Sequence, residues 1–481
     1  MEELTTGNHH IGGGAPPPPP PPPERHVAVF AFPFSSHPPL LLTLVRRLAS
    51  ASSPTVVFSF FNTAKSNRSL FSDFSCHNIR PYDVSDGIPE GYVFLGKPLE
   101  DIDLFLAVAE EELRKGVKVA EADIGLKVGC LVVDAFLWFS GDMAEEMKIP
   151  WVAFWTAGAC SLAAHFYTDL IRSKSSQLLK GSLAVPDKDE IVDFIPGFSA
   201  IRLSDLPEGV LFGNLESPFS TMLHKMGRSI AKATAVPINS FQQLDPDLTK
   251  NLSSELNNFL NIGPLNLITS KQNPPSKADE FSCISWLESQ EPRSVAYISF
   301  GTVCTPPPHE LVAIAEALEE SKTPFLWSIN NDAKKHFPEG FLERTTADDG
   351  SGKVVPWAPQ VQVLEHIATG VFVTHGGWNS VLESVGAGVP MICRPFFGDQ
   401  PTNSWMIEKV WGIGVRIEGG SFTKRGTLSA FEQLLSKDGP RKEFKERSEA
   451  LKGLAHEAVE PNESCGKNFK TLVDVVTSTT L

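Results

Sequence analysis

Short apolar runs alternate with longer amphipathic stretches along the first half of the chain. Four of these runs are rich in β-branched and aromatic residues: HVAVFAF (26–32), TVVFSFF (55–61), CLVVDAF (130–136) and WVAFWT (151–156). Runs that are apolar at nearly every position predict strands buried on both faces, as in a parallel sheet covered by helices. The stretches between them have helical periodicity, so we predict a Rossmann-like α/β domain over residues 25–262.

The same alternation returns in the second half. Its apolar runs are VAYISFG (295–301), PFLWSI (324–329), VFVTHG (371–376) and PMICRPF (390–396). They predict a second Rossmann-like domain over residues 281–455. Residues 263–280 lose periodicity and collect Pro, Ser and charge, so we predict that they link the two domains. A chain of 481 residues is also too long for one ordinary core.

Composition narrows the class of protein. The net charge of −15 argues against nucleic-acid binding, which calls for a basic patch. The seven cysteines are scattered without a C-x-x-C pair, so we expect reduced, buried thiols and no structural zinc. The N-terminal segment lacks the Lys or Arg followed by an apolar stretch that is typical of a secretory signal, and no apolar run is long enough to span a membrane. We therefore predict a cytoplasmic protein without membrane insertion.

Residues 1–24 form a Gly-rich and then Pro-rich tail that includes eight consecutive prolines, Pro16 to Pro23. Such a run favours extended polyproline II without a packed core. We favour a neutral extension over the alternative, a binding site for an SH3-like partner.

A glycine-rich turn lies between a predicted strand (371–374) and a predicted helix (379–388). Gly376 and Gly377 let the backbone approach a ligand closely. The free N–H groups at the start of the helix favour a phosphate. This part of the chain therefore predicts a diphosphate site.

Polar side chains around the turn suit the rest of a sugar nucleotide. Trp357 offers a face for base stacking, Glu383 a carboxylate for two ribose hydroxyls, and Asp399 and Gln400 accept from and donate to sugar hydroxyls. The His375 ring can donate a hydrogen bond to a phosphate oxygen. None of these contacts needs a metal.

Two of these assignments have a structural alternative. Ser380 and Glu383 match the S-x-x-E capping box that closes a helix N-terminus, and Trp357 also suits an ordinary core position. Taken together, the residues favour a sugar-nucleotide site.

The block from Trp357 to Gln400 resembles the signature of plant UDP-sugar-dependent glycosyltransferases, which starts on Trp and ends on Gln as here. Outside the block and the N-terminal tail, the chain is similar to the flavonoid and anthocyanidin 3-O-glucosyltransferase branch. The segments that carry this similarity are FAFPFSSH (30–37), SDGIPEGYVF (85–94), DAFLWFS (134–140), AFWTAG (153–158), SFGTVCTPPP (299–308) and GVRIEGGSFTK (414–424). Two positions depart from the family: Gly376 replaces the usual Cys, and Leu99 stands where close relatives carry Gln, so that a hydrogen bond to the acceptor is missing.

The resemblance implies an α/β protein of GT-B fold, with two Rossmann-like domains facing each other across a cleft and a final helix, within residues 456–481, returning to the first domain. The implied reaction is an inverting transfer of glucose from UDP-glucose to the 3-hydroxyl of an anthocyanidin or flavonol, which gives a 3-O-β-glucoside. Another UDP-sugar (galactose or rhamnose) or another phenolic acceptor is the alternative, although a terminal Gln400 goes with glucose more often than a His does. We expect no metal or other cofactor, and a monomer whose partners are its small-molecule substrates.

His37 and Asp134 each follow a predicted strand of the first domain, where functional groups of α/β sheets collect. From the residues alone, His37 is an N-cap before a helix that starts at Pro38, and Asp134 is a turn former. Transfer to a hydroxyl needs a base, and a neutral imidazole oriented by a carboxylate suits that step. Both positions match the family's dyad, so we predict His37 as the base and Asp134 as its partner.

The resemblance, with the reasoning above, assigns the remaining site residues. Predicted donor-binding residues are Thr156, Thr302, Trp357, Ala358, Gln360, His375, Trp378, Asn379, Ser380, Glu383, Asp399 and Gln400. Predicted acceptor-binding residues are Ser35, Leu99, Phe136, His165 and Phe397. Of these, Phe136 and Phe397 offer flat faces to a polyphenol.

Three other hypotheses were weighed. D-x-D sequences at 101–103 and 245–247 match a Mn²⁺ motif of some glycosyltransferases, but neither lies at a predicted strand end, so we interpret them as surface carboxylates. A sugar-nucleotide-binding protein without turnover is disfavoured because both residues of the dyad are present. A nicotinamide-dependent oxidoreductase is disfavoured because no G-x-G-x-x-G fingerprint occurs.

Overall fold

The computed structural model describes residues 22–72, 78–97, 99–179, 190–198, 201–269, 279–346, 351–436 and 440–478. Most of the predicted proline-rich tail and half of the predicted linker, residues 270–278, therefore lie outside the described residues. The described part of the predicted linker contains the short helix α9 (Leu265–Thr269). Within the described residues, no helix combines the length and the apolar character that crossing a membrane requires.

The first sheet has five parallel strands in the order β3-β2-β1-β4-β5. They are β1 (Arg25–Phe30), β2 (Val56–Thr63), β3 (Ile79–Val84), β4 (Val128–Asp134) and β5 (Trp151–Phe154). Every residue of β2 and β5 is buried, as the apolar runs predict for strands covered on both faces. Two isolated parallel bridges connect β5 to β8 (Val236–Ile238): Val152 pairs with Ala235, and Trp155 pairs with Ile238. Strand β8 in turn pairs with β9 (Phe259–Asn261).

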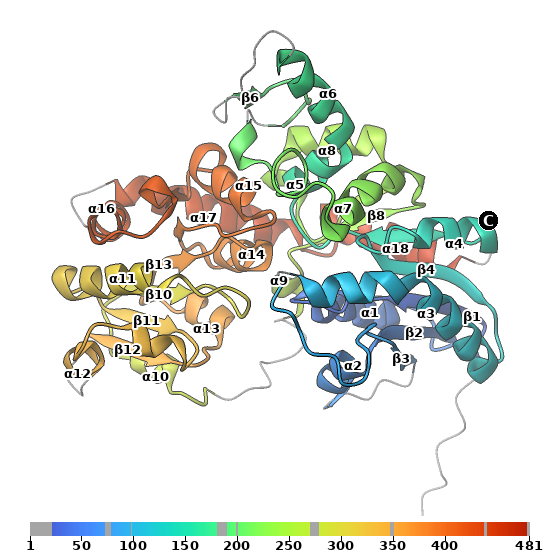
Figure 1. Ribbon diagram of the computed structural model, residues 1–481, viewed down its shortest axis with the longest axis horizontal. Coiled ribbons are helices and arrows are strands. Elements are labelled where there is room, and N and C mark those ends of the chain that lie inside the picture. Colours follow the sequence, from blue (N-terminus) through green and yellow to red (C-terminus); the bar gives the residue numbers. More distant parts are fainter. Residues whose placement is uncertain are drawn as a thin grey trace, which may run out of the picture.

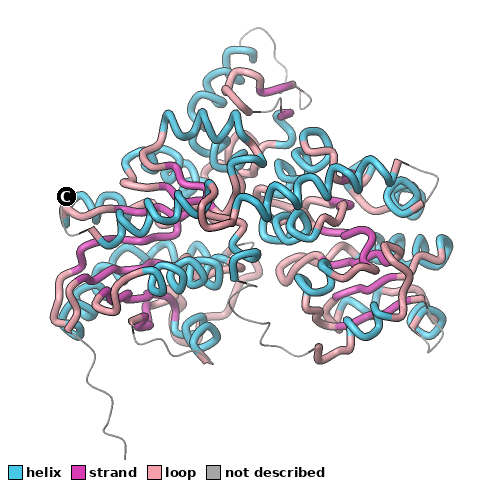
Figure 2. The backbone as a smooth tube through the Cα atoms, turned by 180° about the vertical axis from the view of Figure 1, so that it is seen from behind, coloured by secondary structure: helices cyan, strands magenta, loops and turns pink. Residues whose placement is uncertain are grey.

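Helices lie on both sides of this sheet (Figure 2). Successive side chains of a strand point to opposite faces, so Val27 of β1 packs with α1 (His37–Ala51), whereas Phe30 packs with α3 (Glu100–Ile124). The other elements of this first domain are α2 (Ala64–Phe71), α4 (Ser140–Met147), α5 (Ala159–Phe166), α6 (Thr168–Leu179), β6 (Ile191–Val192), β7 (Ile201–Arg202), η1 (Leu203–Asp205), α7 (Pro218–Ser229), η2 (Ile230–Lys232), η3 (Gln242–Leu244), α8 (Pro246–Glu255) and α9 (Leu265–Thr269).

The second sheet has six parallel strands in the order β12-β11-β10-β13-β14-β15. They are β10 (Val295–Ser299), β11 (Phe325–Ser328), β12 (Gly352–Val355), β13 (Thr369–Thr374), β14 (Met391–Cys393) and β15 (Gly414–Arg416). The helices of this second domain are α10 (Cys283–Glu288), α11 (Pro308–Ser321), η4 (Ala333–His336), α12 (Phe341–Thr345), α13 (Gln360–Glu365), α14 (Trp378–Ala387), α15 (Gln400–Trp405), the π-helix η5 (Met406–Val410), η6 (Glu418–Gly420), α16 (Lys424–Leu435) and α17 (Arg441–Ala458).

The last helix, α18 (Ser464–Thr477), lies among the elements of the first sheet (Figure 1). Asn468 Nδ2 donates to the Asn261 carbonyl at 2.9 Å, and the Arg47 guanidinium lies 3.6 Å from the centre of the Phe469 ring. The chain therefore returns to its first domain at the end. Residues 456–458, which the sequence assigned to this helix, are instead the last residues of α17.

Both sheets have the Rossmann strand order, which confirms the predicted fold class. In the first sheet the order reverses between β1 and β4, and in the second between β10 and β13. Loops that leave the carboxyl ends of such strand pairs diverge to opposite faces and leave a crevice between them. These two points are the places where the fold positions functional side chains.

Candidate active site

His37 and Asp134 meet at the reversal point of the first sheet. His37 is the first residue of α1, which follows β1, and Asp134 is the last residue of β4. His37 Nδ1 lies 2.7 Å from Asp134 Oδ2 and 3.3 Å from Thr156 Oγ1. Asp134 is fully buried, while the His37 side chain remains 16% exposed. Both contacts use Nδ1, so Nε2 is the ring nitrogen left to take a proton.

Of the two structural alternatives for this pair, the helix-capping role of His37 is wrong and the turn-forming role of Asp134 is correct. The N-cap of α1 is Ser36, and His37 is inside the helix, so His37 does not cap it. Asp134 does form the turn after β4, because its Oδ1 accepts from the Phe136 backbone N–H at 3.1 Å. Its other oxygen serves His37, so the carboxylate fixes both the turn and the imidazole.

Aromatic rings enclose the imidazole. The Phe136 ring centre lies 4.7 Å from that of His37, and the Phe32 ring centre lies 5.2 Å from it. Trp155 continues the cluster, with Phe136 on one side at 5.7 Å and His165 on the other at 5.9 Å. Burial lowers the pKa of His165 to about 3, so this ring is neutral at physiological pH.

Three predicted acceptor-side residues lie at the surface. Ser35 and Leu99 have left-handed backbone conformations, with φ of 52° and 60°, and Leu99 precedes the first residue of α3. Phe397 lies in the loop after β14 and is 44% exposed. Exposed apolar side chains of this kind suit contact with an apolar ligand.

The glycine-rich turn lies at the reversal point of the second sheet, between β13 and α14. Gly376 has φ of +79°, which an L side chain rarely adopts. A Cβ at Gly301 would lie 3.2 Å from His375 Cε1, so the exposed turn after β10, which carries Thr302, lies against this one. Burial lowers the pKa of His375 to about 4. Its Nδ1 and the side-chain oxygen of Asn379 are buried without a hydrogen-bond partner among the described residues, as is common at ligand sites.

Gln360, Ser380 and Glu383 form a hydrogen-bonded group beside the turn. Gln360 Nε2 donates to Glu383 Oε2 at 2.7 Å and to Ser380 Oγ at 3.1 Å, and Tyr297 donates its hydroxyl to Gln360 Oε1 at 3.0 Å. Burial raises the pKa of Glu383 to about 7. The capping-box alternative is wrong, because α14 begins at Trp378 with Gly377 as its N-cap, so Ser380 lies inside the helix.

Trp357 and Ala358 precede α13. Trp357 is 38% exposed and Ala358 is buried. Trp378 is also buried, and its indole N–H donates to the Asn239 carbonyl of the first domain at 2.7 Å. Its indole N–H is therefore already bound, and the contact of Trp378 with the donor stays a prediction.

Asp399 is the N-cap residue of α15, and Gln400 is the first residue of this helix. Burial raises the pKa of Asp399, and the hydrogen bond from Asn403 opposes this shift. Asn403 Nδ2 donates to Asp399 Oδ2 at 2.9 Å. Gln400 Oε1 accepts from the backbone N–H groups of Phe396 and Phe397 at 2.8 and 3.2 Å. We predicted that Gln400 both accepts from and donates to the sugar. Its side-chain oxygen is already bound within its own loop, so only donation by its side-chain N–H remains as a prediction.

The interpretation of both D-x-D sequences as surface carboxylates is wrong for Asp245, which is buried. Asp101 and Asp103 lie in the first turn of α3, and Asp245 is the N-cap residue of α8 beside the Trp411 indole N–H at 3.4 Å. In the part of the chain that the structure describes, no group of three or more His, Cys, Asp or Glu is placed to hold a metal ion.

Sequence reasoning missed the partners that hold the site residues in place. Tyr297, Asn239 and Asn403 are examples, and none of them lies within a motif. Tyr297 lies 63 positions from Gln360, and Asn239 lies 139 positions from Trp378. Pairs so distant in sequence leave no periodic signal.

Known proteins resemble this chain over most of its length. The family model described as "UDP-glucoronosyl and UDP-glucosyl transferase" matches residues 105–461. Two relatives are each 55% identical to this chain, over 94% of this chain and 97% of their own length. They are the anthocyanidin 3-O-galactosyltransferase of Rhododendron delavayi and the anthocyanidin 3-O-glucosyltransferase of Vitis vinifera. Over the same shares, the flavonol 3-O-glucosyltransferase of Arabidopsis thaliana is 53% identical. The crystal structure of a UDP-glucose: anthocyanidin 3-O-glucosyltransferase in complex with UDP has a TM-score of 0.87 and 42% identity, and it covers 95% of this chain and 99% of that one.

Proposed function

The chain belongs to this family of UDP-sugar transferases, and from that premise we propose that it transfers glucose from UDP-glucose to the 3-hydroxyl of an anthocyanidin or a flavonol. The observation that carries the proposal is the His37–Asp134 pair, whose Nδ1 and Oδ2 atoms lie 2.7 Å apart at the reversal point of the first sheet.

His37 is the general base of the proposed reaction. Its Nε2 takes the proton of the acceptor hydroxyl as the oxygen attacks the anomeric carbon and the bond from that carbon to UDP breaks. Asp134 accepts the Nδ1–H hydrogen bond, which fixes the tautomer and stabilises the imidazolium that forms. Attack in line with the departing UDP inverts the anomeric centre and gives a β-glucoside from UDP-α-glucose.

The glycine-rich turn and the start of α14 form the donor side of the proposed site. The diphosphate gains charge as UDP leaves, and the backbone N–H groups and positive end of α14 stabilise it, with Thr302 from the neighbouring turn. Glu383 binds the ribose and Trp357 the base. We propose that these groups suffice without a metal, so activity should survive treatment with EDTA; loss that Mg²⁺ or Mn²⁺ restores would contradict this.

UDP-galactose is the second candidate donor. Relatives named as galactosyltransferases and as glucosyltransferases are equally similar to this chain. Gln400 favours glucose through its side-chain N–H, since its oxygen is bound to Phe396 and Phe397.

The test is incubation of the purified protein with UDP-glucose, UDP-galactose or UDP-rhamnose against cyanidin, quercetin or kaempferol, with the position of the sugar read by NMR. A 3-O-β-glucoside as the main product supports the proposal. Tight binding of UDP without any product would favour a non-catalytic sugar-nucleotide-binding protein, and reduction of a substrate by NADH would favour an oxidoreductase.

A cytoplasmic location and a monomeric state belong to the same proposal. Six cysteines are described, all of them free thiols and five of them buried, which suits a reducing compartment. Light scattering of the purified protein checks the monomeric state. Microscopy of a fluorescent fusion protein checks the cytoplasmic location.

A further inference from the structure

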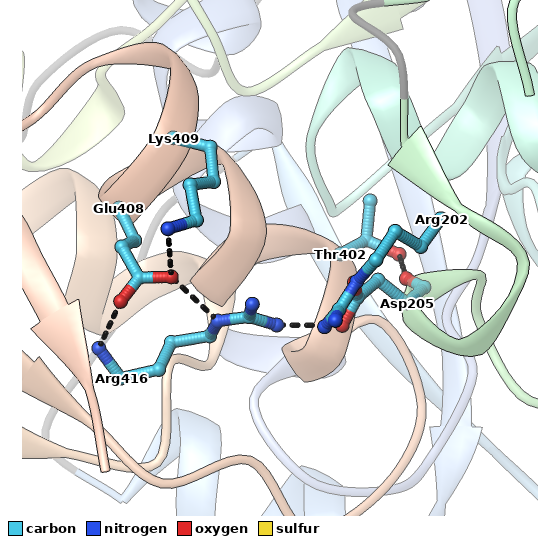
Figure 3. A network of polar contacts seen from close by, with 6 residues as sticks. All are labelled: Arg202, Asp205, Thr402, Glu408, Lys409 and Arg416. Carbon is cyan, nitrogen blue, oxygen red and sulfur yellow. Dashed lines mark hydrogen bonds and ion pairs between the residues drawn. The ribbon is translucent and has the colours of Figure 1, made fainter. Parts of the chain in front are cut away.

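Asp205 of the first domain contacts Arg416 and Thr402 of the second domain (Figure 3). It ends η1 in the first domain, and its side chain is 6% exposed. Asp205 Oδ1 accepts from Arg416 Nη1 of the second domain at 2.6 Å, and Oδ2 accepts from Arg202 Nε at 2.7 Å. Because both oxygens of a buried carboxylate are paired, this residue has one well-defined position.

The main chain around Asp205 binds the segment that carries Asp399 and Gln400. Thr402 donates its hydroxyl to the Asp205 carbonyl at 2.7 Å, and the Glu208 N–H donates to the Gly398 carbonyl at 3.3 Å. These two bonds lie on either side of Asp399 and Gln400 in the sequence. We call residues 202–208 the first-domain loop and residues 398–402 the sugar segment.

Further contacts hold the sugar segment and the rest of α15. Gln400 Oε1 accepts from two backbone N–H groups, and Asp399 accepts from Asn403. The Trp405 ring lies 5.0 Å from the Arg202 guanidinium and 5.2 Å from that of Arg416. A displacement of the first-domain loop is therefore transmitted to Asp399 and Gln400 together.

We propose that Asp205 is a positioning residue that sets how well the enzyme distinguishes UDP-sugars. It holds the sugar segment of the second domain at a fixed place relative to His37 of the first. Donors that differ in one hydroxyl are distinguished by hydrogen bonds that require this placement, because a hydrogen bond weakens steeply with misalignment. This inference rests on the proposed function, in which Asp399 and Gln400 bind the sugar.

Two variants test the contacts separately with little change in side-chain shape. Asp205→Asn removes the charge that binds Arg416, and Thr402→Val removes the hydroxyl that binds the Asp205 carbonyl. For each, we expect the KM for UDP-glucose to rise on the order of tenfold and the ratio of kcat/KM for UDP-glucose to that for UDP-galactose to fall several-fold. The Kd for UDP, which has no sugar, should stay at the wild-type value.

The matched control is Glu449→Gln, which removes an ion pair between Glu449 and Arg293 at the amino end of β10, away from the site. It should leave the KM and the sugar ratio unchanged. Wild-type KM and sugar ratio in both folded test variants would overturn the proposal, as would an equal rise in the Kd for UDP. If Asp205→Asn does not fold, Thr402→Val decides. A wild-type protein that transfers no sugar refutes the proposed function instead.

Discussion

At the scale of single residues, the chemistry of this protein depends on hydrogen bonds that fix the orientation of a few polar groups. Asp134 binds His37 Nδ1, and Gln360 binds both Ser380 and Glu383. The sequence identified most of these residues from their types and positions. The capping box that the sequence offered as the alternative for Ser380 and Glu383 does not form, because their common partner Gln360 lies 20 positions upstream of Ser380.

Glu383 should make UDP binding depend on pH. Burial raises the pKa of Glu383 to about 7, and only the carboxylate accepts from two ribose hydroxyls. As the pH falls below 7, the fraction of carboxylate falls, so the Kd for UDP should rise by up to about tenfold per pH unit. Above pH 7 it should level off.

Isothermal titration of UDP between pH 5.5 and 8.5 measures this dependence. Glu383→Gln is the comparison, because the phosphates of UDP titrate equally with both proteins and their effect cancels in the ratio of the two Kd values. A ratio that stays constant over this range would show that Glu383 does not bind the nucleotide as a carboxylate.

At the scale of secondary structure, the sequence predicts most strands of the two sheets but misses β3, β12 and β15, and it predicts the docking of elements poorly. An apolar run such as TVVFSFF is buried in any parallel sheet, so its identity as a strand follows from its own residues. The return of α18 to the first domain was expected only from the family resemblance. The contact of α14 with the first domain, through Trp378 and Asn239, was not expected, because it depends on where two distant elements meet.

Gly158 allows the contact between α14 and the first domain. A Cβ at this position would lie 2.8 Å from the Trp378 ring, which cannot withdraw while its N–H is bound to Asn239. Gly158→Ala should therefore lower the free energy of unfolding by about 1–3 kcal/mol and reduce activity. Denaturant unfolding and steady-state kinetics measure both effects.

Gly453→Ala is the matched control for this substitution. Gly453 lies inside α17, and nothing is within 4 Å of the Cβ that would be added. The same change should leave activity intact and raise stability by up to about 1 kcal/mol, since alanine favours helix. Equal effects of the two substitutions would refute the close contact at Gly158.

At the scale of the whole molecule, the proposed site exists only where the two domains meet. The pair of His37 and Asp134 lies at the reversal point of the first sheet, and the glycine-rich turn lies at that of the second. The sequence predicted both sheets and both sets of residues. The resemblance also implied that the two domains face each other across a cleft. It did not give the contacts that hold them together, because a pair such as Asp205 and Arg416 joins segments 211 positions apart.

The most direct test of the account separates turnover from donor binding in a His37→Ala variant. His224→Ala is the control, because His224 forms a similar 2.7 Å pair with Asp169 away from the proposed site. We predict that His37→Ala lowers kcat at least about 100-fold while the Kd for UDP stays near the wild-type value, and that His224→Ala retains activity. Wild-type kcat in the His37→Ala variant would contradict the assignment of His37 as the base.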